Sequence, residues 1–261
     1  MSQSALLTIG AAAMSLLAAT GITRAAAHEW PGPQGGSWAS IDHLPDWSGA
    51  WALSDGSFQK QFLASSGPDG NPNVPPLTPK WAAFRDANGA ANHGQGPPRG
   101  VNTNSLHCLP DGMPGMMAAP FSFEFLFTPG RVTVISEDGE VRRIWTDGRA
   151  HPPDPDPTFA GNSIGHWEGT TLVVDTIGMT PQAEVMVGLH DTAKTHVVER
   201  IFKKSSHTLR IDTVVIDPAL FTKPYRYTRT YDLNPHGMTE YVCEQNNRDQ
   251  NGKINLTPPP N

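Results

Sequence analysis

Apolar and polar residues alternate with a period of two along most of the chain after residue 120, and this pattern limits the possible folds most. In PFSFEFLF, the side chains of Phe121, Phe123, Phe125 and Phe127 fall on one face of an extended segment. A period of two predicts strands, because a helix repeats every three or four residues. An Asp-Gly pair at 138–139 separates two such runs and predicts a tight hairpin.

About nine segments have strand character, and no helical pattern is interposed regularly between them, so we expect antiparallel pairing. They are DWSGAWALS, PFSFEFLF, RVTVISE, VRRIWTD, HWEG–TTLVVDT, THVVERIFKK, HTLRIDTVVID, YRYTRTYDL and TEYVCEQ. Many successive antiparallel strands form a sandwich or a barrel, and closure into a barrel removes the exposed edges. We expect a mainly β fold, an antiparallel barrel similar to lipocalins or calycins, with an interior cavity and one or two short helices.

The segment before the barrel has a different composition. Gly and Pro number 25 each in 261 residues, and many of them lie in a loop-rich arm that covers residues 28–106. Within this arm, LTPKWAAFRDANG predicts a helix, with Thr78 as N-cap, Pro79 as its first residue and Gly89 beyond its end. The arm has too little apolar material for a core of its own. We therefore expect one domain, with the barrel body in residues 107–261.

The first 27 residues predict export. An uncharged run of small and apolar residues, Ala5–Ile22, is followed by Ala-Ala-Ala before His28, which is typical of a secretory signal peptide with cleavage after Ala27. The alternative is a membrane anchor, but a spanning helix is usually richer in Leu, Ile and Val. We expect a periplasmic or secreted protein without stable membrane insertion. The net charge of −6 gives no basic surface for phosphates, so nucleic acid is not an expected partner.

The chain has two cysteines, Cys108 and Cys243. In an oxidising compartment two lone cysteines are expected to form a disulfide. The enclosed loop is long, so the chain-entropy model gives a stabilisation of about 4–5 kcal/mol. A reactive thiol is the alternative, although neither residue belongs to a C-x-x-C pair.

Several His residues lie near carboxylates in the sequence and are candidates for acid–base chemistry. Arg149 is a candidate for stabilising developing negative charge. The proposed catalytic residues are His151, His190, Glu199, Asp175 and Arg149. The alternative is that the same residues are structural, as surface imidazoles or as members of a salt-bridge network.

A second group of residues is expected to contact the ligand. In YRYTRTYDL, Tyr225, Tyr227 and Arg229 share one face, which suits a small aromatic or apolar molecule. The alternative is that they belong to the barrel wall, with Arg229 in solvent. Arg142 and Arg143 lie on opposite faces, so one of them points inward and requires a carboxylate partner. The proposed substrate-binding residues are Arg143, Tyr225, Tyr227, Arg229, Trp167 and His196.

No cofactor signature is present. The chain lacks G-x-G-x-x-G after a strand and G-x-x-x-x-G-K-[ST]. GNSIG at 161–165 has the outline of G-x-S-x-G around Ser163, but the strand-to-helix context of a nucleophile elbow is missing. A metal held by His151, His190, His196 and a carboxylate is an alternative, but H-x-x-E on a strand places its two side chains on opposite faces. We therefore expect a cofactor-independent protein. Its oligomeric state is not indicated by any motif.

Several longer motifs are shared with other proteins. CLPDGMP, EDGEVRRIWTDGRAHP, GNSIGHWEGTTLVVDTIG, HVVERI, VVIDPALFTKPY and YVCEQN resemble a large group of secreted, mostly uncharacterised bacterial proteins with the motifs DGR-x-HP, G-x-SIG-x-WEG-x-TLVVDT and H-x-x-ER. This resemblance covers roughly residues 108–246. It implies a site or a structural signature at Arg143, Arg149, His151, Glu168, Asp175, His190, Glu199 and Arg200.

Together, these features predict an exported, cofactor-independent enzyme. We expect a lyase or isomerase that performs acid–base chemistry on a small aromatic or apolar molecule in the barrel, with a lignin-derived phenolic as one concrete version. The alternative is a non-catalytic periplasmic protein that binds an apolar ligand in the same place.

Overall fold

The computed structural model describes residues 36–54, 75–84, 104–186 and 189–243. These residues belong to one compact unit, Pro33–Asn261. The expected signal peptide at 1–27 and the expected helix end at Gly89 lie outside the described residues. No helix in the described ranges has the length and apolar character needed to cross a bilayer.

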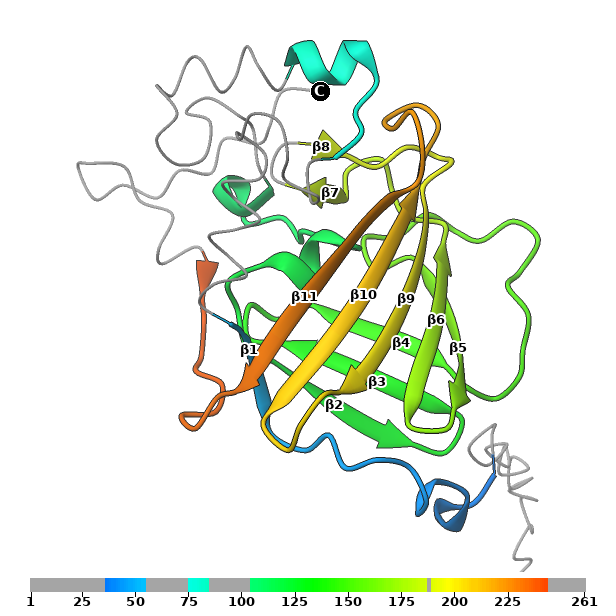
Figure 1. Cartoon of the computed structure of the whole chain (residues 1–261), viewed down its shortest axis with the longest axis vertical. Helices are drawn as coiled ribbons and strands as arrows, with labels where there is room; N and C mark the ends of the chain where they lie inside the picture. Colours follow the sequence, from blue (N-terminus) through cyan, green and yellow to red (C-terminus); the bar gives the residue numbers. More distant parts are fainter. Residues whose placement is uncertain (1–35, 55–74, 85–103, 187–188, 244–261) are drawn as a thin grey trace, which may run out of the picture. The chain divides into compact units, whose positions relative to one another are not determined.

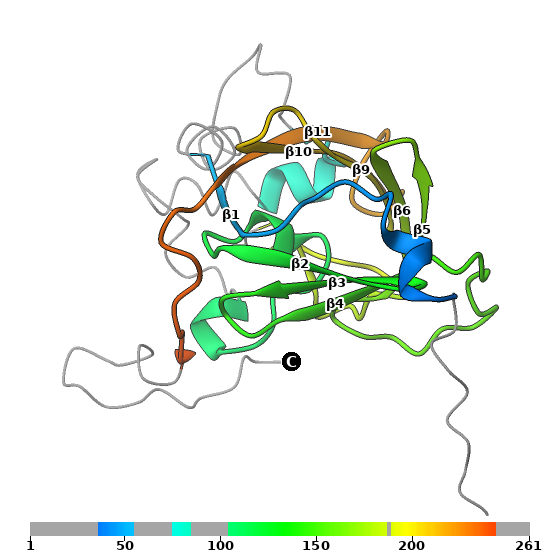
Figure 2. The same cartoon turned by 90° about the horizontal axis from the view of Figure 1, so that it is seen from below.

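Nine strands close into a barrel (Figures 1 and 2). The predicted mainly β barrel is therefore confirmed. Around the barrel the strand order is β1-β11-β10-β9-β6-β5-β4-β3-β2. The strands are β1 (Ala50–Leu53), β2 (Phe123–Thr128), β3 (Arg131–Ser136), β4 (Val141–Trp145), β5 (Asn162–Glu168), β6 (Thr171–Ile177), β9 (His196–Lys203), β10 (Thr208–Ile216) and β11 (Tyr225–Leu233).

The arm contributes one of these strands. β1 lies between β2 and β11, and it pairs antiparallel with both. It is much shorter than β11 (Figure 1), and its last register partner in β11 is Tyr231. The arm also contains the 3-10 helix η1 (Trp38–Ile41) and a helical segment at 79–84, which begins at Pro79 as predicted. Thr78 precedes this segment in the N-cap position: its carbonyl accepts from the backbone N–H of Ala82 at 2.9 Å, while its hydroxyl donates to the carbonyl of Ala219.

One strand pair in the barrel is parallel, which corrects the expectation of a wholly antiparallel barrel. Ile144 and Trp145 of β4 pair in parallel with Ser163 and Ile164 of β5. A parallel neighbour requires a crossover connection of a dozen or more residues. Here residues 146–161 form it, and they run outside the barrel as a long loop between β4 and β5 (Figure 1).

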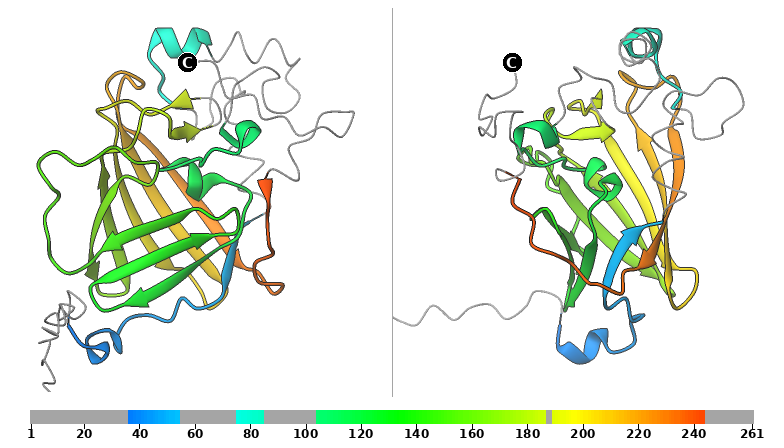
Figure 3. Two further views of the ribbon diagram at one scale, coloured as in Figure 1. Left: turned by 180° about the vertical axis from the view of Figure 1, so that it is seen from behind. Right: turned by 90° about the vertical axis from the view of Figure 1, so that its left-hand side faces the viewer.

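Short elements gather near one end of the barrel (Figure 3). They are η2 (Asn104–His107), η3 (Gly115–Ala118) and the two-stranded sheet of β7 (Glu184–Met186) and β8 (Leu189–His190). This small sheet was not predicted. The predicted strand at TEYVCEQ is wrong, because residues 239–242 have no strand structure. Glu137 instead accepts hydrogen bonds from the backbone and hydroxyl of Thr239, which hold this segment beside the β3–β4 turn.

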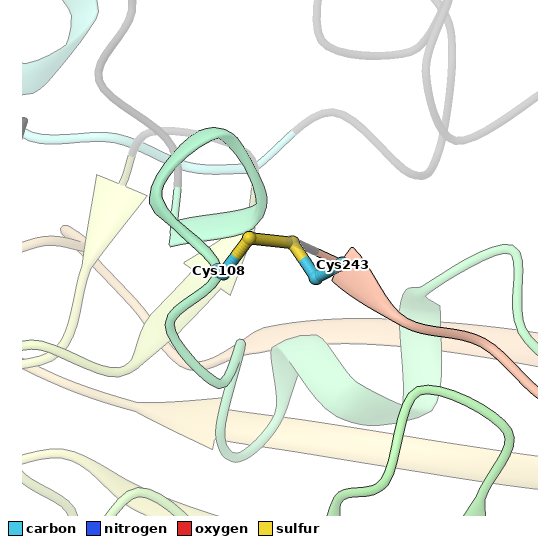
Figure 4. Close-up of a disulfide and its surroundings, with 2 residues drawn as sticks. All are labelled: Cys108 and Cys243. Atoms are coloured by element: carbon cyan, nitrogen blue, oxygen red, sulfur yellow. A yellow bond between two sulfur atoms is a disulfide. The ribbon is translucent and has the colours of Figure 1, made fainter. Parts of the chain in front are cut away.

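The predicted disulfide is present (Figure 4). It joins Cys108, just after η2, to Cys243, with the two Cα atoms 5.5 Å apart and 135 positions apart in sequence. The bond connects the segment that leads into the barrel with the segment that leaves it.

Inward-facing residues follow the predicted alternation. In β10 every second residue from Leu209 to Val215 is buried, and in β11 the buried set is Tyr225, Tyr227, Arg229 and Tyr231. In β2, Phe123 and Phe125 belong to the core. Phe121 departs from this pattern, because it lies before the strand and packs against Tyr241, with the ring centres 4.7 Å apart.

Candidate functional site

Strand alternation divides the predicted site residues between the two faces of the barrel wall. Glu199 is buried inside the barrel, whereas its neighbours His196 and Arg200 on the same strand face outward. Asp175 on β6 also faces outward, beside buried Thr176. The predicted catalytic set is therefore two separate groups rather than one site.

The inner group is centred on an ion pair. Arg142 donates from Nη2 to Oε2 of Glu199 at 2.5 Å, and both side chains are 0% exposed. The same guanidinium donates to the hydroxyls of Ser163, at 3.2 Å, and Thr176, at 3.0 Å. The expectation that one of the two neighbouring arginines points inward is met by Arg142, which is buried, whereas Arg143, the proposed substrate-binding residue, is exposed. Apolar residues occupy both faces of β4, so the alternation could not identify the inward arginine.

Arg229 adds a second buried guanidinium to the interior. It is 4% exposed and lies against the ring of Tyr227, with 4.3 Å between its Cζ and the ring centre. Burial lowers the pKa of Arg229, but the nearby phenols of Tyr227, Tyr231 and Tyr225 and the charge of Glu199 outweigh this effect and raise it. Burial raises the pKa of all three tyrosines, against an opposing effect of Arg229. At neutral pH the guanidinium is therefore charged and the phenols are protonated.

Several polar atoms in this interior have no hydrogen-bond partner among the described residues. They are Nη1 of Arg142, Oε1 of Glu199, the Tyr227 hydroxyl, and Nε and Nη1 of Arg229. Buried polar groups are nearly always satisfied by protein or by another molecule, because leaving one unpaired costs about 1–3 kcal/mol. Five such atoms within one barrel therefore indicate a place for a polar partner.

The outer group joins two imidazoles through one carboxylate. Nε2 of His151 lies 2.9 Å from Oδ1 of Asp175, and Nε2 of His196 lies 2.9 Å from Oδ2 of the same residue. The other ring nitrogen of His151 lies 2.6 Å from Oδ1 of Asn162. His151 belongs to the crossover, whereas Asp175 and His196 belong to β6 and β9. The cluster therefore fixes the crossover to the outside of the barrel, which favours the structural reading of these residues.

Two other predicted catalytic residues lie apart from both groups, so the predicted set is spread over more than these two places. His190 is in β8 and contacts the carbonyl of Gln182 at 3.2 Å. Arg149 forms a bidentate ion pair with Asp147, and its guanidinium carbon lies 3.9 Å from the ring centre of Trp145. These two contacts of Arg149 stabilise the conformation of the first residues of the crossover.

Trp167 has a packing role. Its ring centre lies 5.2 Å from that of Trp47 and 5.6 Å from that of Phe127. Trp47 in turn packs against Phe125. These rings form a cluster in which Trp167 is held by other aromatic side chains, so its predicted ligand-binding role gains no support from its contacts.

The histidines do not form the metal site that was considered as an alternative. Both Nε2 atoms of the outer group are directed at carboxylate oxygens of Asp175. Within the described part of the chain, no three His, Cys, Asp or Glu side chains are placed to hold a metal ion.

Arg142 and Tyr231 belong to the interior but were not among the proposed site residues, although the sequence indicated that one of Arg142 and Arg143 points inward. Tyr231 donates to the carbonyl of Met117, which ties η3 to the barrel interior. Tyr231 shares the face of Tyr225 and Tyr227 in sequence, so its burial followed from the same alternation, whereas its partner on η3 had no sequence signal.

Comparison with known proteins adds nothing to this picture, since no family model and no curated protein matches the chain.

Proposed function

We propose that the protein is an exported, cofactor-independent enzyme, a lyase or isomerase, that performs acid–base chemistry on a small aromatic or apolar molecule inside the barrel. The observation that supports this proposal is the set of unpartnered polar atoms on Arg142, Glu199, Tyr227 and Arg229, all in the barrel interior. A substrate with one polar end would provide the partners that these atoms lack.

The charges of the interior suit an anionic or phenolic oxygen. Two guanidinium groups, of Arg142 and Arg229, face one carboxylate, that of Glu199, so the interior carries an excess positive charge. A buried charge without a partner is costly, and a negative ligand oxygen would offset this cost. The rings of Tyr225, Tyr227 and Tyr231 offer contact area for the apolar or aromatic part of the ligand.

Proton transfer is assigned to the interior groups rather than to the histidines. Oε1 of Glu199 has no partner and would accept a proton from the substrate, while Arg229 would stabilise the negative charge that develops. The Tyr227 hydroxyl would donate a proton at the second position. An isomerase returns the proton to another atom of the same molecule, whereas a lyase releases the leaving group.

Export is part of the proposal. The Cys108–Cys243 disulfide supports an oxidising compartment, and residues 1–27 have the sequence of a signal peptide.

The first test is a thermal-shift screen of phenols and aromatic carboxylates, followed by mass spectrometry of the mixtures. We expect one class to raise the melting temperature and to be converted to a product. Glu199→Gln and Tyr227→Phe should each lower turnover by roughly 100-fold or more. Glu199→Gln also removes the partner of buried Arg142, so it should destabilise the fold. Tyr227→Phe keeps the buried ring and leaves the Arg142–Glu199 pair intact, so it should lower the melting temperature much less than Glu199→Gln.

Matched controls come from the outer face of the same wall. Glu168 and Arg200 form an exposed ion pair, so Glu168→Gln and Arg200→Met should leave turnover unchanged. A ligand that stabilises the protein but is never converted would overturn the enzymatic proposal in favour of a binding protein. Wild-type turnover in both Glu199→Gln and Tyr227→Phe would show that the reaction does not take place in the barrel interior.

A further inference from the structure

A pocket of about 320 Å³ lies at the edge of the barrel, apart from the interior group. Its lining includes the β3–β4 turn at 138–141, the segment 108–111 and the Cys108–Cys243 disulfide. The volume is within the range of small-molecule sites. The disulfide fixes two of its walls to each other, since Cys108 and Cys243 belong to different walls. The disulfide therefore holds these two walls of the pocket together.

Aromatic rings form the apolar walls. Phe121 and Tyr241 line the pocket together, with their ring centres 4.7 Å apart and their planes inclined by 55°. Phe159, which comes from the end of the crossover, lines it as well. Aromatic side chains are the usual lining of sites for organic cations, because the ring face is electron-rich.

The polar lining is acidic. Asp111, Asp138 and Glu140 all line the pocket, whereas no Lys, Arg or His is among its described lining residues. The carboxylate of Glu140 accepts hydrogen bonds from the backbone N–H groups of Asp111, at 2.6 Å, and Gly112, at 3.0 Å. These two bonds fix the position of the carboxylate in the wall.

Glu140 is also poised to change charge near neutral pH. Burial, together with the charges of Asp138 and Asp111, raises its pKa to about 7, against the opposing effect of the two backbone hydrogen bonds. The titratable groups that line the pocket are these three carboxyls and the Tyr241 phenol. A positive ligand would favour the ionised form of Glu140 and would relieve its repulsion with the other carboxylates.

We propose that this pocket binds a small organic cation, with an ammonium group against the carboxylates and an apolar or aromatic portion between the rings of Phe121, Tyr241 and Phe159. The three acidic residues of the lining attract a cation and repel an anion, and a neutral apolar molecule would gain nothing from their charge. A metal ion is a poorer fit, because no three such side chains in the described ranges converge closely enough to hold one.

The test uses the whole protein with probes of equal shape and different charge. Calorimetry should detect binding of phenethylamine and of benzyltrimethylammonium, and no binding of 2-phenylethanol, phenylacetate or calcium. The quaternary probe keeps its charge at every pH, so its affinity reports on the pocket alone. We expect this affinity to increase by about tenfold between pH 5.5 and 8.5, because Glu140 ionises over this range.

Two variants and one control complete the test. Glu140→Gln should remove the pH dependence, and Asp138→Asn should weaken binding at every pH while keeping that dependence. Glu168→Gln, on the outer barrel face, should behave as the wild type. Equal affinity for phenethylamine and 2-phenylethanol, preferential calcium binding, absence of binding at pH 8.5, or wild-type behaviour of both pocket variants would each overturn the proposal. None of these outcomes bears on the barrel interior.

Discussion

At the scale of single residues, two buried side chains of the same type have different hydrogen-bond partners. Arg142 and Arg229 are both buried, yet Arg142 has a carboxylate and two hydroxyls as partners while two nitrogens of Arg229 have none. The guanidinium of Arg142 is anchored by an ion pair, whereas that of Arg229 is a buried charge with no carboxylate partner among the described residues. The sequence predicted that Arg229 shares a face with the tyrosines of this strand, and the structure shows that this face is buried.

Asp191 supports a prediction on pH and stability. It is 4% exposed, and burial raises its pKa to about 8, with Asp217 adding to the effect and Thr195 opposing it. Because the folded-state pKa lies above the unfolded value, the folded state binds the proton more tightly. The stabilisation is full at about pH 4 and is lost as the pH rises toward 8. Asp191→Asn keeps a neutral group there, so the variant should melt at a higher temperature than the wild type at pH 8.5.

The expected gain at pH 8.5 is at least about 1 kcal/mol in the free energy of unfolding. At about pH 3, below the unfolded-state pKa of an aspartate, the variant and the wild type should be nearly equal. Asp154 is an exposed carboxyl in the crossover, and Asp154→Asn serves as the control. Thermal denaturation at the two pH values provides the measurement, and a gain of the same size at both would show that Asp191 is not protonated in the folded protein.

At the scale of elements, the crossover is the feature that decides how β4 and β5 pair. Gly178, at the end of β6, has φ 69°, and a Cβ there would lie 2.7 Å from Cγ of Pro155 in the crossover. Gly169 has a similar φ of 61°, but a Cβ there would meet nothing within 4 Å. A side chain at Gly178 would therefore be disfavoured twice, by the left-handed backbone and by the contact with Pro155 of the crossover.

Gly178→Ala should consequently cost more stability than Gly169→Ala. Both variants bear the penalty for a left-handed backbone, about 1–2 kcal/mol, and only the first also displaces Pro155. Amide hydrogen exchange should become faster within residues 152–160 in Gly178→Ala and stay unchanged there in Gly169→Ala. If both variants show the same loss of stability and the same exchange rates, the crossover is not held by this contact.

Elements were predictable from sequence where local alternation determined them. The β3–β4 hairpin followed from Asp138-Gly139, and the buried faces of β10 and β11 followed from their period of two. The parallel β4–β5 pair did not, because its geometry depends on how Pro155 and His151 attach the crossover to β6. The division of the candidate site was also hidden, since the faces of β6 and β9 depend on closure of the barrel.

At the scale of the molecule, the disulfide ties the beginning of the barrel body to its end. Replacing both Cys108 and Cys243 with Ala should lower the free energy of unfolding by up to about 4–5 kcal/mol. Chemical denaturation of the variant, and of the reduced wild type, should give the same lower midpoint. Unchanged midpoints in both would mean that the noncovalent contacts around the pocket hold these segments without the bond.

The position of β1 has a consequence for biogenesis. The first strand pairs with β11, the last, at Trp51↔Leu233. A polypeptide that emerges from a ribosome or a translocation channel N-terminus first therefore cannot seal its sheet until residue 233 has appeared. Until then, strand edges remain available for association with other chains. Nascent molecules truncated before that point would keep these edges exposed and would be substrates for holding chaperones and housekeeping proteases.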